Sequence, residues 1–237
     1  MKKNNIPHSN HRYNKNRAHL LILFKNLVEY ESIDYNPVRD LSKKTIEKRQ
    51  REVISLEKFK EIITELKNKH YNLHRFLLVF FYASVRTTEI LSVQKKHVDL
   101  DKQEYEVLIK KGKQYAWVKK IIIPAALPYW KEIYSNTRNP EDFLFSHRLV
   151  PGKKKLNRQQ ISKYWLRWVK NPKGITEDFY SLKHLFTDML DEFQNSPNFD
   201  LAQEMASHTN SNTTDIYRTG KEKRKNENLK KVSISIN

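Results

Sequence analysis

Hydrophobic positions recur at helical spacing in several stretches of the chain. Residues 17–31 carry an apolar stripe and predict an amphipathic helix with one buried face, ending before Pro37. Residues 55–68 predict a second helix, with Ser55 as its N-cap. Residues 72–84 are apolar nearly all round, as expected of a central buried helix. The stripe of the first stretch consists of Leu20, Leu23, Phe24, Leu27 and Val28.

A different pattern follows, with a third helix beginning near Thr87 and then two runs rich in β-branched and aromatic residues. These runs cover residues 104–111 and 114–124, and the Lys-Gly-Lys sequence between them predicts a β-hairpin. The remainder returns to helical periods interrupted by prolines. We therefore expect a mainly α-helical fold with one small antiparallel sheet, in the α+β class.

Residues 37–54 are polar, rich in Lys and Arg and short of large apolar side chains, which predicts an interdomain linker. The segment is either a solvated connector or a basic strand that lies along a DNA backbone. The predicted organisation is a helical segment at 1–36, the basic linker at 37–54, a globular domain at 55–220 and a basic tail at 221–237.

The charge of the chain points to a polyanionic partner. Lys and Arg number 45 against 27 Asp and Glu, a formal net charge of +18 spread along the sequence. Nucleic acid is the obvious candidate. A basic membrane-surface protein is the rival, but the chain has no long basic amphipathic helix with a Trp or Phe face and no lipidation signal. Its longest apolar runs fall far short of the roughly 20 residues that span a bilayer.

Several classes of site are excluded by what the sequence lacks. It has no cysteine, so it can form neither disulfides nor thiolate metal sites, and a reducing cytoplasm suits it. Its four glycines form no phosphate-cradling loop, and no histidine pair stands at metal-ligand spacing. The N-terminus has no apolar signal region. We expect no cofactor, no metal and no membrane partner.

Three stretches combine residue types that suit phosphate chemistry. A helix start presents Arg86 with Glu89 one turn on, and the hairpin tip carries Lys111. The third stretch comprises residues 178–190 and 206–220. Taken singly, each feature has an ordinary structural explanation: a surface ion pair, a turn lysine or a half-buried packing residue. The third stretch holds Tyr180, Lys183, His184, His208 and Tyr217, of which His184 is expected to be structural.

The order of these features resembles the tyrosine recombinases, or phage-type integrases. Their catalytic domain carries an R-x-x-E segment, a hairpin Lys, an H-x-x-R box and a G-H box followed by a nucleophilic Tyr. The resemblance covers about residues 55–220, and residues 11–37 resemble the last helix of the family's core-binding domain, so 1–36 would be a partial core-binding segment. Lys110 and Lys113 are alternatives to Lys111. The departures are Tyr180 for His, Lys183 for the second Arg and Ser207 for Gly.

The resemblance implies a mechanism for DNA strand exchange. Tyr217 would attack phosphorus and form a 3′-phosphotyrosine, and Lys111 would protonate the leaving 5′-oxygen. Arg86 would clamp the phosphate, with Lys183, His208 and Tyr180 as further donors. The implied partners are double-stranded DNA and DNA-bending accessory proteins. The implied assembly is a homotetramer on two DNA sites. The implied setting is a cytoplasmic, nucleoid-associated integrase of a mobile genetic element.

Two functions remain open at this point. The first is a competent site-specific recombinase, favoured by the presence of Arg86, His208 and Tyr217. The second is a catalytically impaired DNA-binding remnant or regulator with the integrase fold, favoured by Tyr180 and Lys183. A Tyr hydroxyl can donate to a phosphate oxygen, whereas Lys keeps the charge of Arg but loses its bidentate geometry. A type IB topoisomerase has similar chemistry, but the box spacing is closer to integrases.

Overall fold

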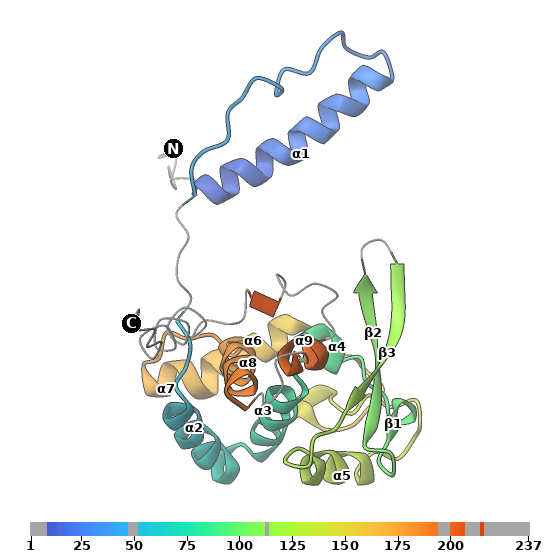
Figure 1. The fold of residues 1–237 in the computed structure, drawn as a ribbon, viewed down its shortest axis with the longest axis vertical. Coiled ribbons are helices and arrows are strands. Elements are labelled where there is room, and N and C mark those ends of the chain that lie inside the picture. Colours follow the sequence, from blue (N-terminus) through green and yellow to red (C-terminus); the bar gives the residue numbers. More distant parts are fainter. Residues whose placement is uncertain (1–8, 47–51, 112–113, 194–199, 207–213, 216–237) are drawn as a thin grey trace, which may run out of the picture. The chain divides into compact units, whose positions relative to one another are not determined.

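The computed structural model describes residues 9–46, 52–111, 114–193, 200–206 and 214–215 (Figure 1). The chain forms two compact units, residues 1–50 and 51–237.

The first unit consists of helix α1 (Asn10–Glu29) and a return segment. The helix begins earlier than the hydrophobic pattern predicts because Ser9 caps it, its hydroxyl accepting a hydrogen bond from the backbone N–H of Arg12. The side chain of Asn14 then bonds the backbone N–H and C=O of Lys44, at 2.8 and 2.7 Å. Residues in the first half of the expected linker therefore run back along α1.

The predicted buried stripe of α1 is wrong. None of the residues described in this helix is buried, and Leu20 and Leu23 remain 43% and 52% exposed. Helical spacing places apolar side chains on one face, but burial requires a second surface that covers the face. In the described part of this unit only the polar return segment lies against α1, and Val38 is its one buried apolar residue.

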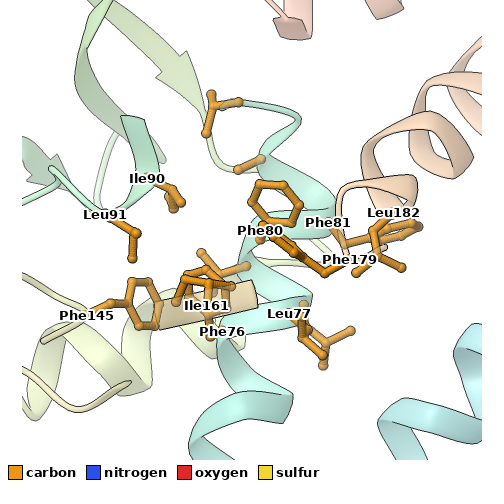
Figure 2. Packing of buried hydrophobic residues seen from close by; sticks show 14 of the residues in the cluster. Phe76, Leu77, Phe80, Phe81, Ile90, Leu91, Phe145, Ile161, Phe179 and Leu182 are labelled. Atoms are coloured by element: carbon orange, nitrogen blue, oxygen red, sulfur yellow. The ribbon is translucent and has the colours of Figure 1, made fainter. Parts of the chain in front are cut away.

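The second unit is built around helix α3 (Tyr71–Ala83), which contacts α2 (Leu56–Lys69), α5 (Leu127–Ser135) and α8 (Ser181–Phe193). Phe76 and Phe80 of α3 are fully buried and pack against aromatic side chains of other elements. Figure 2 shows this cluster, with Phe76 beside Phe145 and Phe80 beside Phe179. The expectation of a central buried helix over residues 72–84 is confirmed.

The sheet has three antiparallel strands in the order β1 (Val98–Asp99), β2 (Glu104–Lys111) and β3 (Gln114–Ile121). The predicted hairpin is present, and the short strand β1 is added to it. In the hairpin register Leu108 faces Trp117 and Tyr105 faces Lys120. Because side chains alternate between the two faces of a strand, Leu108 and Trp117 are exposed while Tyr105 and Lys120 are buried.

Short elements connect these parts and complete the second unit (Figure 1). The fold is mainly helical with one small antiparallel sheet, as the sequence predicts. Among the helices of the described residues, none combines the length and hydrophobicity needed to cross a membrane. The connecting elements are α4 (Thr87–Ile90), η1 (Lys95–His97), η2 (His147–Leu149), α6 (Arg158–Trp165), η3 (Leu166–Lys170), α7 (Asn171–Lys173) and α9 (Leu201–Ala206).

Candidate active site

Arg86 stands directly before α4, where the chain turns away from the end of α3. Its backbone N–H donates to Glu89 Oε2 at 2.7 Å, and its Nη1 donates to Glu89 Oε1 at 2.8 Å. The Glu89 side chain is only 7% exposed, whereas that of Arg86 is 44% exposed. Arg86 and Glu89 therefore do not form an ordinary surface ion pair. The carboxylate of Glu89 is buried, and a buried carboxylate needs a charged partner. Glu89 fixes the guanidinium at the surface, where a ligand can reach it.

Lys183 lies in the first turn of α8 and is only 1% exposed. Burial lowers the pKa of Lys183 to about 8, the nearby charges of Arg86 and Lys120 also lower it, and Glu89 opposes them. These four residues therefore form one electrostatic cluster. The value of about 8 leaves the ammonium of Lys183 mostly protonated at pH 7, so three cations and the carboxylate of Glu89 meet in this cluster.

Tyr180 immediately precedes α8 and is partly buried. Its ring packs near Phe80 and Phe179, with centroid distances of 6.3 Å to each. The guanidinium carbon of Arg158, the first residue of α6, lies 5.5 Å from the centre of the Tyr180 ring. His184 is 2% exposed and lies edge-on to Tyr180, within the packed interior. Tyr180 thus lies between the aromatic core and a second guanidinium.

An open groove of about 740 Å³ lies beside Arg86, against the exposed face of the hairpin. Tyr115 and Trp117 on this face are 63% and 54% exposed. The groove combines positive charge with aromatic surface, and both suit contact with a nucleic acid. Its cationic lining residues are Arg86, Lys96, Lys110 and Lys155.

Some predicted site residues are not described by the structure. Lys111 is the last residue of β2, but its side chain lies outside the described residues, as do His208 and Tyr217. Among the described site residues, Arg86 and Lys183 lie close enough for their charges to interact. Lys110 lines the groove beside Arg86. Tyr180 precedes Lys183 by three residues in the sequence. The described residues of α9 reach Ala206, and His208 follows outside the described residues.

Lys120 is a member of the charge cluster that the sequence interpretation missed. It is 4% exposed, and its Nζ donates to the backbone carbonyls of Glu204 and Met205 at 3.3 and 2.5 Å. A signal was available, because Lys119 and Lys120 are consecutive in a strand. Consecutive strand residues point to opposite faces, so one of the two had to point toward the interior.

The model of the phage integrase family matches residues 52–224, most of the chain. The chain belongs to the phage integrase family. The expected resemblance is thereby confirmed, and the matched residues include both His208 and Tyr217. No curated protein matches the sequence.

Solved structures of integrases share the fold. The Tn1549 transposon integrase in complex with circular intermediate DNA superposes with a TM-score of 0.67 at 14% identity, covering 89% of this chain and 75% of that one. A lambda integrase dimer bound to a core site gives 0.69 at 15% identity, with 88% and 73% covered. The XerA recombinase gives 0.60 at 17% identity, with 99% and 86% covered. At such identities the likeness shows the fold alone.

Proposed function

We propose that this member of the phage integrase family is a site-specific DNA recombinase that cleaves and rejoins strands through a 3′-phosphotyrosine at Tyr217. The observation that carries the proposal is the cluster in which Arg86, Lys120 and Glu89 act on the buried Lys183, next to a basic and aromatic groove. Its cations suit a phosphodiester, whose negative charge grows in the transition state.

In this mechanism the Tyr217 phenolate attacks phosphorus, the bond from phosphorus to the 5′-oxygen breaks, and the 5′-oxygen takes a proton. The energy of the broken bond is kept in the phosphotyrosine, so another 5′-hydroxyl can reverse the step without ATP. Arg86 contributes a planar pair of donors to the non-bridging oxygens. Lys183, Tyr180 and His208 contribute further donors.

The proton donor belongs to the hairpin. The family pattern gives this role to Lys111, at the end of β2. Lys110 is the described hairpin lysine that lines the groove of Arg86, so it is the competing candidate. A lysine suits the role because an ammonium beside a phosphate can pass one proton to the leaving alkoxide as the bond breaks.

Double-stranded DNA is the proposed partner, and a homotetramer on two DNA sites is the proposed assembly. The net charge of +18 and the cationic groove favour a duplex. Solved structures with a similar fold include a lambda integrase dimer bound to a core site and a lambda integrase tetramer bound to a Holliday junction. Residues 1–36 are proposed as part of a core-binding domain, residues 37–54 as the basic linker and residues 55–220 as the catalytic domain.

A DNA-binding remnant without turnover is the second candidate. The burial of Lys183 and its lowered pKa favour it, because a buried amine reaches a phosphate less easily than a guanidinium at the surface. The remnant would bind DNA but form no covalent bond to it.

Covalent capture from a random pool separates the two candidates, because it requires no chosen target sequence. The protein is incubated with a pool of nicked duplexes whose central sequence is randomised, and protein-linked DNA is recovered after denaturation and sequenced. We expect adducts that converge on one sequence with the wild type and none with Tyr217→Phe. Equal recovery from both proteins, or duplex binding with no adduct in the whole pool, would refute the recombinase.

A further inference from the structure

A second cavity of the second unit lies at the beginning of α3, away from the groove of Arg86. It has a volume of about 550 Å³ and shares no lining residue with that groove. Helix α3 begins beside this cavity at Tyr71 and ends at Ala83, three residues before Arg86. Its 13 residues give it a length of about 20 Å. We call this separate cavity the α3-start pocket; it is lined by residues 69–73, 147–149, 164, 167 and 168.

The lining of the α3-start pocket is basic. It includes Lys69, Arg148 and Arg167, and no Asp or Glu is among the described residues that line it. Lys69 is already paired with Glu65, at 2.9 Å. Within the described part of the chain, neither Arg148 nor Arg167 forms an ion pair with a carboxylate. Two guanidinium groups thus line one cavity without a counter-charge, which a bound anion would supply.

Local structure prepares these two arginines for binding. The guanidinium carbon of Arg167 lies 4.6 Å from the centre of the Trp168 ring, on which His70 also packs, with a centroid distance of 3.7 Å. Arg167 and Trp168 belong to the π-helical turn η3, and such turns are frequent at functional sites. Arg148 has a φ of 57°, in the left-handed region that is strained for a non-glycine residue. A guanidinium that is already ordered loses less freedom when it binds a ligand.

The chemistry of the α3-start pocket fits the phosphates of duplex DNA. A guanidinium offers a planar fork of donors that matches phosphate oxygens. Because His70 and Arg167 already pack on Trp168, this ring is not an open platform for an unpaired base, which favours backbone contacts with a duplex. Duplex DNA carries one negative charge per roughly 1.7 Å of its axis. A chain with a net charge of +18 attracts such a polyanion strongly.

We propose that the α3-start pocket binds the phosphate backbone of a second DNA duplex through Arg148 and Arg167. The inference goes beyond the proposed function, in which DNA occupies only the groove beside Arg86. One protomer then holds two DNA segments, one at each end of α3, without the help of another subunit.

The number of duplexes bound per protomer tests this proposal. A labelled duplex of about one helical turn is titrated into the protein, and analytical ultracentrifugation measures the bound ratio. We expect two duplexes per protomer for the wild type and one for the double variant Arg148→Gln/Arg167→Gln. The Kd of the first duplex should change less than about threefold, whereas that of the second should rise about tenfold or more.

A charge-matched control separates the pocket from the general attraction of a basic surface. The double variant Lys60→Gln/Arg138→Gln removes the same charge at two exposed positions outside both cavities, and it should still bind two duplexes. Thermal unfolding checks that each variant is folded. If the double arginine variant does not fold, Arg148→Gln alone takes its place. A second duplex that both double variants lose equally overturns the proposal.

Competing ligands identify what the pocket binds. A mononucleotide carries the same phosphate chemistry without a duplex, and a copolymer of Glu and Tyr carries the carboxylates of an acidic protein. Each is added to the complex that holds one duplex per protomer. We expect a further duplex to bind at least about tenfold more tightly than either competitor. Equal or tighter binding of the mononucleotide would indicate a small phosphate ligand, and tighter binding of the copolymer an acidic protein; either result overturns the proposal.

This test and the test of the recombinase fail separately. If covalent capture yields no adduct, the recombinase proposal fails, and the ratio of bound duplexes still decides whether the second site exists. If adducts form but the wild type binds one duplex per protomer, the recombinase proposal stands and the second site is refuted.

Discussion

The buried carboxylate of Glu89 accepts one hydrogen bond from the backbone N–H of Arg86 and another from its guanidinium, at 2.7 and 2.8 Å. One side chain thus fixes both the start of α4 and the direction of the arginine. The same carboxylate opposes the loss of the proton from Lys183. Glu89 consequently supports both cations that the proposed mechanism places on the phosphate.

Replacement of Glu89 by Gln should impair both the site and the fold. The amide keeps a similar shape and one acceptor but loses the charge that supports Arg86 and Lys183. We expect the rate of adduct formation to fall about 10- to 100-fold, and the free energy of unfolding to fall by about 1–3 kcal/mol. Glu141→Gln is the control, because Glu141 forms an exposed ion pair with Lys96. Equal rates for the two variants would contradict the role of Glu89.

The pH dependence of cleavage should report the protonation of Lys183. Its pKa of about 8 means that the amine loses its charge as the pH rises through 8, whereas a guanidinium in its place stays charged. The ratio of the wild-type rate to the Lys183→Arg rate should therefore fall above pH 8, approaching tenfold per pH unit. Other groups titrate in both proteins, so their effect on the rate cancels in this ratio. A constant ratio between pH 7 and pH 9.5 would show that Lys183 carries no essential charge.

Lys183 should also lower the stability of the folded protein at neutral pH. Its folded pKa of about 8 lies below the ordinary value of 10.5, so between these two pH values the unfolded chain binds more protons and stability rises with pH. Lys183→Met removes the buried charge and should raise the free energy of unfolding at pH 7 by about 1–3 kcal/mol. Urea unfolding measures the gain, which should shrink toward pH 10. A variant less stable than the wild type at pH 7 would contradict this.

A substrate with a 5′-bridging sulfur should identify the proton donor. The thiolate leaving group needs no proton, so loss of the general acid should cost little on this substrate and about 100-fold or more on ordinary DNA. We expect this selective rescue for Lys111→Ala or for Lys110→Ala, but not for Arg86→Ala. Failure of rescue in both lysine variants would place the acid outside the end of the hairpin.

Binding to duplex DNA should weaken steeply with salt, because neutralised phosphates release counterions. Lys155 lines the groove beside Arg86, so Lys155→Gln should lower the slope of log K against log salt by about one. Lys131 on α5 does not line that groove, and Lys131→Gln should leave the slope unchanged. A wild-type Kd that does not vary with salt would refute electrostatic binding.

The sequence alone determined the local elements and the order of the site residues. Helical spacing located α2 and α3, and alternation with a Lys-Gly-Lys turn located the hairpin, because these patterns depend on neighbours a few residues apart. The ordered motifs pointed to the family that the comparison confirms for residues 52–224.

Burial and its consequences follow from the tertiary packing and could not be predicted from the sequence. The stripe of α1 has the right spacing, but among the described residues of its own unit no apolar surface covers it. Glu89, Lys120 and Lys183 are ordinary surface residue types that proved to be buried. The fold brings these three residues close together although Glu89 and Lys183 are 94 residues apart in the sequence. Whether a charge is solvated or buried depends on such distant packing, and burial is what sets the pKa of Lys183 and requires a partner for Glu89.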